Sequence, residues 1–118
     1  MAGILDTLNG ISDALTAEGI RAAVDTRDLN APCAWVTPNQ ATTGMYMCGS
    51  GELRVDIYLI SPDHGYVRSL ETLESLLSKA LEVIEPDEPV SLSEAVVLPD
   101  SPNPLPAFLL TIKLPVEP

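Results

Sequence analysis

Side chains that commonly perform chemistry are scarce in this sequence. Its 118 residues include a single histidine, His64, and two well-separated cysteines, Cys33 and Cys48. Nucleophilic catalysis needs a base beside the nucleophile, and a structural zinc site needs four ligands, usually with a close-spaced pair among them. The sequence therefore predicts no enzyme, no metal site and no cofactor. A thiolate–imidazole pair of His64 with either cysteine stays an open alternative.

Long apolar runs and positive charge are also lacking. No stretch approaches the roughly 20 apolar residues that cross a bilayer, and residues 1–20 hold no basic residue, so we expect a soluble chain without a signal peptide. In such a chain the cysteines are expected to be buried thiols rather than a disulfide. Only six Lys and Arg oppose 17 Asp and Glu, for a net charge of −11. This charge disfavours nucleic acid and anionic membranes as partners, and it also suits solubility alone.

Aromatic residues make up only 4% of the chain, so Leu, Ile and Val must supply the core. Two segments have helical periodicity. In the first, Gly19 and Ile20 follow the apolar stripe as a typical helix end; the stripe comprises Ile4, Leu8, Ile11 and Leu15. The second follows Asp63, a candidate cap, and ends before Pro86. Its stripe comprises Val67, Leu70, Leu73, Leu77, Ala80, Leu81 and Ile84.

Several short segments alternate apolar and polar residues, as strands do. The predicted strands span residues 20–24, 34–37, 45–48, 52–60, 95–98 and 107–114. Residues 45–48 and 52–60 flank a glycine-bearing tip and form a hairpin. The four prolines of residues 99–106 predict a connection, because proline lacks the backbone donor that a strand ladder uses.

Strands in a row joined by hairpins favour an antiparallel sheet, and two amphipathic helices can cover one of its faces. We therefore predict one α+β domain over residues 1–118, with an antiparallel or mixed sheet, two helices packed on one face, and the order α-β-β-β-α-β-β. The other face is then exposed or covered by another chain. Tyr58 and Leu109, on the outward sets of their strands, favour a covering chain.

Three segments together resemble the small tail terminator proteins of long-tailed phages, particularly those that infect actinobacteria. The segments are DTRDLNAPCAWVTP, MCGSGELRVDIYLISP and VVLPDSPNPLPAFLLTIKLPV, at residues 25–38, 47–62 and 96–116. With the helices between them, the resemblance covers nearly the whole chain. It implies a mixed sheet flanked by two helices and no catalytic residues.

The resemblance also implies a virion protein at the head–tail junction, made in the host cytoplasm. Such proteins form a homo-oligomeric ring, usually a hexamer, that caps the tail tube, ends its polymerisation and offers its other side to neck or head-completion proteins. The expected partners are therefore sister subunits, the tail tube protein and a neck protein, with no membrane. DNA would pass through the lumen without specific binding, and carboxylates lining that path would repel its phosphates over about 8 Å.

The loop that begins at Asp25 and the tip of the predicted hairpin are the expected interface regions. Trp35 is the only tryptophan, and aromatic anchors dominate interfaces, although a core role is the alternative. Arg27 and Arg54 could meet carboxylates of a neighbour, or pair locally with Asp28 or Asp56. Asp25 and Asp28 could hold a divalent ion, but a role in turning the loop is favoured. The predicted interface set is Asp25, Arg27, Asp28, Trp35, Tyr46, Arg54 and Tyr58.

Two other functions fit the same composition. One is a neck or head-completion ring of the same machine, which composition separates poorly from a terminator. The other is a monomeric acidic module that mimics DNA, as some inhibitors or antitoxins do. Regularly spaced carboxylates on helix surfaces would favour this module, whereas here the acids cluster in loops and at helix ends.

Overall fold

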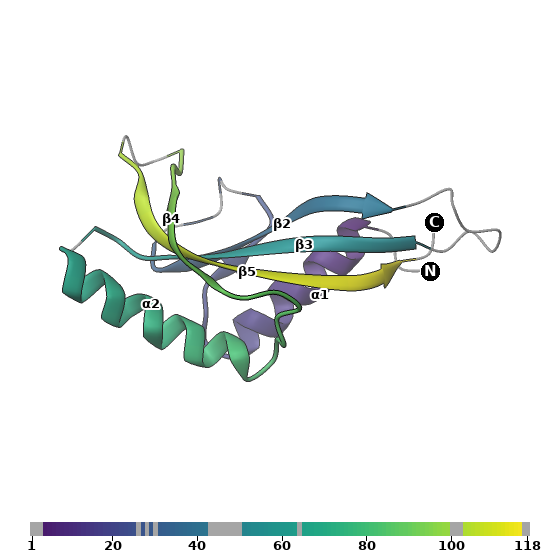
Figure 1. Cartoon of the computed structure of the whole chain (residues 1–118), viewed down its shortest axis with the longest axis horizontal. Coiled ribbons are helices and arrows are strands. Elements are labelled where there is room, and N and C mark those ends of the chain that lie inside the picture. The colour runs from purple at the N-terminus through teal and green to yellow at the C-terminus, as the bar shows by residue number, and fades with distance from the viewer. Residues whose placement is uncertain are drawn as a thin grey trace.

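The computed structural model describes residues 4–25, 27, 29, 31–42, 51–63, 65–99 and 103–116. They form two helices and one five-stranded mixed sheet (Figure 1), which confirms the predicted α+β class and the order α-β-β-β-α-β-β. The strand order is β1-β2-β3-β5-β4; β1 runs parallel to β2, and the other pairs are antiparallel. The elements are α1 Ile4–Ala17, β1 Ala22–Ala23, β2 Cys33–Thr42, β3 Gly51–Ile60, α2 Tyr66–Leu81, β4 Ser91–Val96 and β5 Leu105–Val116.

The predicted end of α1 at Gly19 is confirmed. Gly19 has a φ of 89°, a left-handed conformation that a residue with a Cβ adopts only with strain. Its N–H donates to the Thr16 carbonyl at 3.0 Å, and the Ile20 N–H donates to the Leu15 carbonyl at 3.1 Å. This pair of bonds is the Schellman motif, in which the residue after the glycine packs back on the helix. Ile20 and Leu15 are accordingly both buried.

The boundaries and the apolar stripe of α2 differ from the prediction. The helix ends at Leu81, and one tight turn carries the chain on to Ile84, whose N–H donates to the Ala80 carbonyl at 2.9 Å. Gly65 is the N-cap, and no side chain of the described residues caps the N–H groups of the first helical turn. Asp63 accepts its described hydrogen bond from Gly65 itself, so its predicted role as the cap is wrong. Val67 and Leu81 lie at the margins of the stripe and are exposed, by 66% and 48%. A stripe covers only part of a helix circumference, so its outermost positions reach solvent.

β2 continues past the predicted end at Thr37, through Pro38 to Thr42. The Ala34 N–H donates outward, to the Arg21 carbonyl at 2.8 Å. Backbone groups alternate along a strand, so the nitrogen of Pro38 also faces outward and its missing hydrogen removes no bond to β3. The register shifts between Pro38 and Gln40, which is a β-bulge. The predicted strand over residues 45–48 lies outside the described residues.

The other predicted strands also need adjustment. Only Ala22–Ala23 of the predicted residues 20–24 form a strand, β1. β4 lies at Ser91–Val96 instead of residues 95–98, and β5 begins at Leu105, inside the predicted connection. Pro106 is tolerated there because it lies at the start of the strand, where its carbonyl still accepts the Ser61 N–H at 3.0 Å.

Both helices pack on one face of the sheet, which we call the helix face. The alternation in β3 places Leu53, Val55, Ile57 and Leu59 there, all at most 1% exposed. The predicted packing of two helices on one face is therefore confirmed. The rest of this core comes from the two helices, from the residues just after them, and from β2 and β5. These residues are Leu8, Leu15, Ile20, Ala34, Val36, Leu73, Leu76, Ala80, Ile84, Phe108, Leu110 and Ile112.

The opposite face, which we call the open face, is not open along its whole length. A second apolar cluster covers the end where β3 stops; it comprises Leu29, Cys33, Ile60, Val96, Leu98 and Ala107. The expectation of a face left to solvent or to another chain is therefore wrong at this end, because the chain's own loop at Leu29 and the end of β4 fold over it. The middle of the face is covered less completely.

Candidate functional site

The middle of the open face carries rows of side chains set by the strand register. Trp35 lies opposite Tyr58, and Tyr58 lies opposite Leu109 on the other side. The next row consists of Thr37, Asp56 and Thr111. Trp35, Tyr58 and Leu109 are half-buried, so this apolar row keeps surface that a partner could cover.

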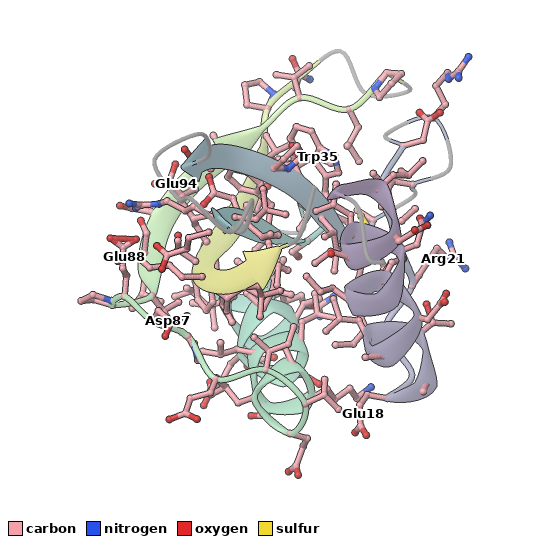
Figure 2. All side chains as sticks on the ribbon, turned by 90° about the vertical axis from the view of Figure 1, so that its right-hand side faces the viewer. Glu18, Arg21, Trp35, Asp87, Glu88 and Glu94 are labelled. Carbon is pink, nitrogen blue, oxygen red and sulfur yellow. The ribbon has the colours of Figure 1, made fainter. Side chains whose placement is uncertain are left out.

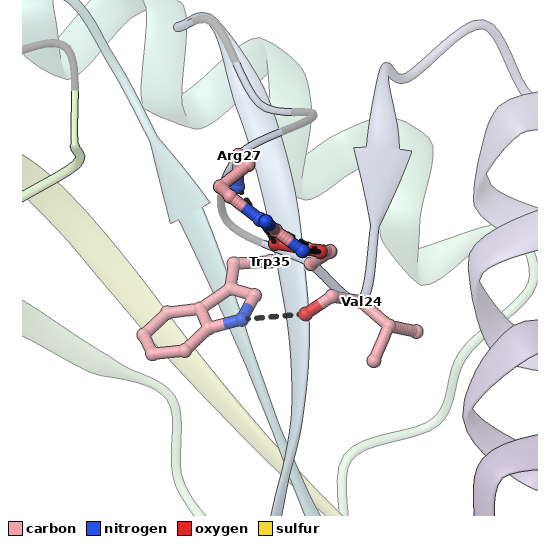
Figure 3. Close-up of polar contacts among 4 residues, drawn as sticks. Val24, Arg27 and Trp35 are labelled. Atoms are coloured by element: carbon pink, nitrogen blue, oxygen red, sulfur yellow. Dashed lines mark hydrogen bonds and ion pairs between the residues drawn. The ribbon is translucent and has the colours of Figure 1, made fainter.

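Trp35 and Tyr58 form a stacked aromatic pair. Their ring centroids are 5.4 Å apart and the planes differ by 24°. The Trp35 Nε1–H donates to the Val24 carbonyl at 3.1 Å (Figure 3), which ties the start of the loop to the open face. Trp35 is therefore half-buried: one side packs against the second apolar cluster, and the rest contributes to the surface.

Negative charge surrounds Tyr58. Partial burial, followed by the charges of Asp56 and Glu94, raises the pKa of the Tyr58 hydroxyl above its ordinary value of 10.0. The phenol therefore stays neutral at physiological pH and remains able to donate a hydrogen bond. Figure 2 looks along the long axis of the molecule, with Trp35 on the side of the sheet away from α2.

Asp25 and Arg27 form a local exposed ion pair. The Arg27 Nη2 atom lies 2.9 Å from Oδ2 of Asp25, and the Arg27 backbone N–H donates to Oδ1 at 2.9 Å (Figure 3). The side-chain bond from Arg27, then the backbone bond, lower the pKa of the Asp25 carboxyl. Arg27 thus pairs within the chain, as the local alternative held, although its described partner is Asp25; Asp28 lies outside the described residues.

Arg54 pairs across the edge of the sheet. Its guanidinium forms an ion pair with Glu88, in the segment between α2 and β4. In the same segment, the Asp87 N–H donates to the Thr111 carbonyl at 2.9 Å, and the Asp87 carboxylate accepts the Lys113 N–H at 2.6 Å. This segment therefore continues the edge beyond β4. Arg54 thus pairs within the chain, but with the distant Glu88 rather than with Asp56, the local partner that the sequence suggested.

Asp56 is a buried carboxylate at the centre of the open face, and the sequence suggested it only as a local partner of an arginine. It is only 6% exposed. The Asn39 Nδ2–H donates to Oδ2 at 2.7 Å, and the Thr111 hydroxyl donates to Oδ1 at 3.1 Å. Asn39 is the extra residue of the β2 bulge. The only sequence signal was the outward position of both Asp56 and Thr111, and only the register places them side by side.

The predicted interface residues fall into three places. Trp35, Tyr58 and Arg54 share the open face, whereas Asp25 and Arg27 lie in the loop that Trp35 holds through Val24. Asp28 and Tyr46 lie outside the described residues, as do His64 and Cys48. Cys33 is buried in the second apolar cluster, and desolvation raises the pKa of its thiol to about 11.

No group of three or more His, Cys, Asp and Glu able to hold a metal ion occurs among the described residues. Within the same ranges, no helix is long and apolar enough to cross a membrane. In comparisons with known proteins, no family model matches the chain, and a search of curated proteins finds no match.

Proposed function

We propose that this chain is a structural protein of a phage tail, which assembles into a ring that caps the tail tube and joins it to the neck. The proposal starts from the resemblance of residues 25–38, 47–62 and 96–116 to tail terminators. The α+β fold agrees with the fold that this resemblance implies. Without a family match, the proposal depends on the surfaces of the molecule.

The observation that carries the proposal is the unequal covering of the two faces of the sheet. Both helices pack on the helix face, while the middle of the open face keeps the half-buried row of Trp35, Tyr58 and Leu109. Aromatic side chains that combine an apolar body with a polar tip are enriched at protein interfaces. A subunit contact on this face would bury them.

The two edges of the sheet are unlike, as a head-to-tail arrangement of subunits requires. β2 with its short neighbour β1 forms one edge, and β4 forms the other. These edges differ in sequence and in the elements beside them, and α1 packs mainly against β1 and β2. A ring needs such unlike surfaces, because each subunit presents one surface to the next and a different one to the previous subunit.

The charge of the chain predicts how assembly responds to ions. Subunits that each carry −11 repel one another when they form a ring. Salt shortens the range of this repulsion to about 8 Å at physiological strength, and divalent cations neutralise carboxylates more strongly. Ring formation should therefore increase with magnesium.

Light scattering after size-exclusion chromatography, with negative-stain imaging, tests the proposal. We expect annular particles whose share rises with protein and magnesium concentration. Tyr58→Glu, on the open face, should prevent assembly because it places a charge in the buried contact. Leu81→Glu is the matched control, since Leu81 is exposed on α2 and away from that face.

Two results would contradict the proposal. A strictly monomeric protein at high concentration with magnesium would leave the monomeric acidic module as the better function. Rings that form equally well with Tyr58→Glu, after circular dichroism has shown a native fold, would exclude the open face as the contact.

A further inference from the structure

A groove runs between α2 and the edge strand β4, apart from the open-face row. Its volume is about 540 Å³, and its walls come from the first turns of α2, from β4 and from the start of β5. Leu70 and Leu73 of α2 form its apolar wall, and Leu92 of β4 is 60% exposed at its rim. A leucine this exposed beside an apolar wall is a feature of surfaces that bind partners.

The backbone of β4 is available along the same groove. β4 is the last strand of the sheet, and β5 is its one partner among the described residues. The Thr111 carbonyl accepts from Asp87, on the β4 side of β5, so Ala107 also directs its backbone groups toward β4. The register of β4 shifts between Ser91 and Glu94, but it is regular from Glu94 to Val96. Glu94, opposite Ala107, therefore faces β5, and Ala95 directs its N–H and C=O groups outward. These groups can pair with an added strand.

Side chains on the two faces of β4 differ in chemistry. Ser93 and Ala95 both line the groove and are small, which leaves room there for larger apolar side chains. Glu94 points to the open face, where its charge acts on Tyr58. A strand added to β4 would thus place alternate side chains in an apolar groove and beside a carboxylate.

Carboxylates predominate along this edge, although Glu88 is paired with Arg54. Figure 2 shows Asp87, Glu88 and Glu94 along the side of the sheet opposite α1. Glu94 accepts a hydrogen bond from the Ser91 hydroxyl at 3.0 Å, and Asp63, at one end of the groove, accepts one from the Gly65 N–H at 3.3 Å. Neither carboxylate forms an ion pair within the described ranges.

We propose that the groove between α2 and β4 binds an extended segment of another protein, in which apolar residues alternate with lysine or arginine. The segment adds a strand to β4, inserts its apolar side chains against Leu70, Leu73 and Leu92, and places its cations beside Glu94. This site does not depend on the proposed ring, because every group that forms it belongs to one chain.

A second copy of this chain is a poor occupant by charge. It brings a net charge of −11, and of its six basic residues Arg27 and Arg54 are engaged in ion pairs. A basic partner segment instead neutralises the acidic edge. The chemistry of the groove therefore favours a different protein.

Fluorescence anisotropy on the full chain tests the site with a labelled peptide, acetyl-Thr-Leu-Lys-Val-Lys-Leu-Thr-amide. We expect a dissociation constant on the order of 100 µM. Ala95→Pro removes the outward N–H and should weaken binding by about tenfold or more. Leu92→Ser should weaken it by about threefold or more. Leu81 is also an exposed leucine but lies at the far end of α2, so Leu81→Ser should leave binding unchanged.

A double-mutant cycle separates a specific contact from general acidity. Glu94→Gln should weaken the lysine peptide by about threefold but should not affect the same peptide with threonine in place of lysine. This cycle also keeps the test decisive if Ala95→Pro disturbs the fold.

The proposal is overturned if the peptide does not bind, if a glutamate-for-lysine peptide binds equally well, or if all variants bind alike. Concentration-dependent NMR shifts at Ser93 and Ala95 without peptide would assign the groove to a second copy instead. All of these results can be read on monomeric protein, so they are distinct from success or failure of ring assembly.

Discussion

The two faces of the sheet are built from alternate residues of the same strands, yet they differ in almost every property. On β3, the helix face carries Leu53, Val55, Ile57 and Leu59, while the open face carries Arg54, Asp56, Tyr58 and Ile60. The helix face is a continuous aliphatic core. The open face passes from an ion pair to a buried carboxylate, then to an aromatic row and finally to a small apolar cluster. One face supplies stability, and the other distributes different kinds of contact along its length.

The largest expected effect is on the reactivity of Cys33. It tests whether the second apolar cluster covers its end of the open face. In a Cys48→Ser background, the Cys33 thiol should react with a disulfide reagent at pH 8 at least about a thousandfold more slowly than in unfolded protein, because reaction requires the cluster to open. Burial raises the pKa of this thiol from 9.0 to about 11, so its contribution to stability is fully present below pH 9 and is lost as the pH rises through 11. Rapid reaction in the folded protein would show that this end is open.

Loss of packing on the helix face should be the largest effect on the free energy of unfolding. Ile57 is fully buried in the core of the helix face, and Ile57→Ala should lower this free energy by about 3–4 kcal/mol, through lost burial and a cavity. Urea unfolding followed by circular dichroism measures the change. Leu81→Ala, at an exposed position, is the control and should change it by less than about 0.5 kcal/mol. Equal effects of the two variants would contradict the assignment of the helix face.

The buried carboxylate of the open face should matter less than the core but more than a surface charge. Asp56→Ala removes the acceptor of the Thr111 hydroxyl, which is itself only 5% exposed, and should cost about 1–3 kcal/mol of stability. Thr111→Val replaces the donor by an apolar group of similar shape. The effect of the two changes together should be smaller than their sum, and strict additivity would show that the two groups do not interact.

The smallest effect should come from the bond that holds the loop on the open face. Trp35→Phe keeps an aromatic ring against Tyr58 but leaves the Val24 carbonyl without the indole N–H, so we expect a loss of about 1 kcal/mol. Thermal unfolding measures it, and Arg27→Gln in the same loop provides a comparison that should leave the midpoint unchanged, since its ion pair is exposed. A change in the midpoint for Arg27→Gln as large as for Trp35→Phe would mean that the loop is held by its ion pair.

Local patterns predicted much of the fold because they follow from backbone geometry and periodicity. The end of α1 at Gly19 and Ile20 needs only a residue free to adopt positive φ and an apolar residue after it. Proline was less informative. Pro38 and Pro106 suggested strand boundaries, but both lie within strands. Pro38 faces the outer side of β2, where its missing N–H removes no bond to β3, and Pro106 lies at the start of β5, where its carbonyl still accepts a bond from Ser61.

The candidate site was predictable only in part. The aromatic and arginine residues were expected to form contacts, but whether those contacts lie within the chain depends on distant segments: Glu88 reaches Arg54, and Val24 reaches Trp35. The groove at β4 could not be predicted, because β4 itself was placed at residues 95–98 and its edge position depends on the order of the sheet.

By itself, the sequence determined the composition of each element, the side chains on each face of β3 and β5, the stop of α1 and the charge of −11. These properties depend on neighbours within a few positions, where backbone geometry fixes which residues share a face. Only the tertiary structure decided which carboxylates are buried, which arginines are paired, and that the chain covers one end of its own open face. Those outcomes depend on strand register and on segments that are far apart along the chain, and a shift of one residue would exchange the two faces.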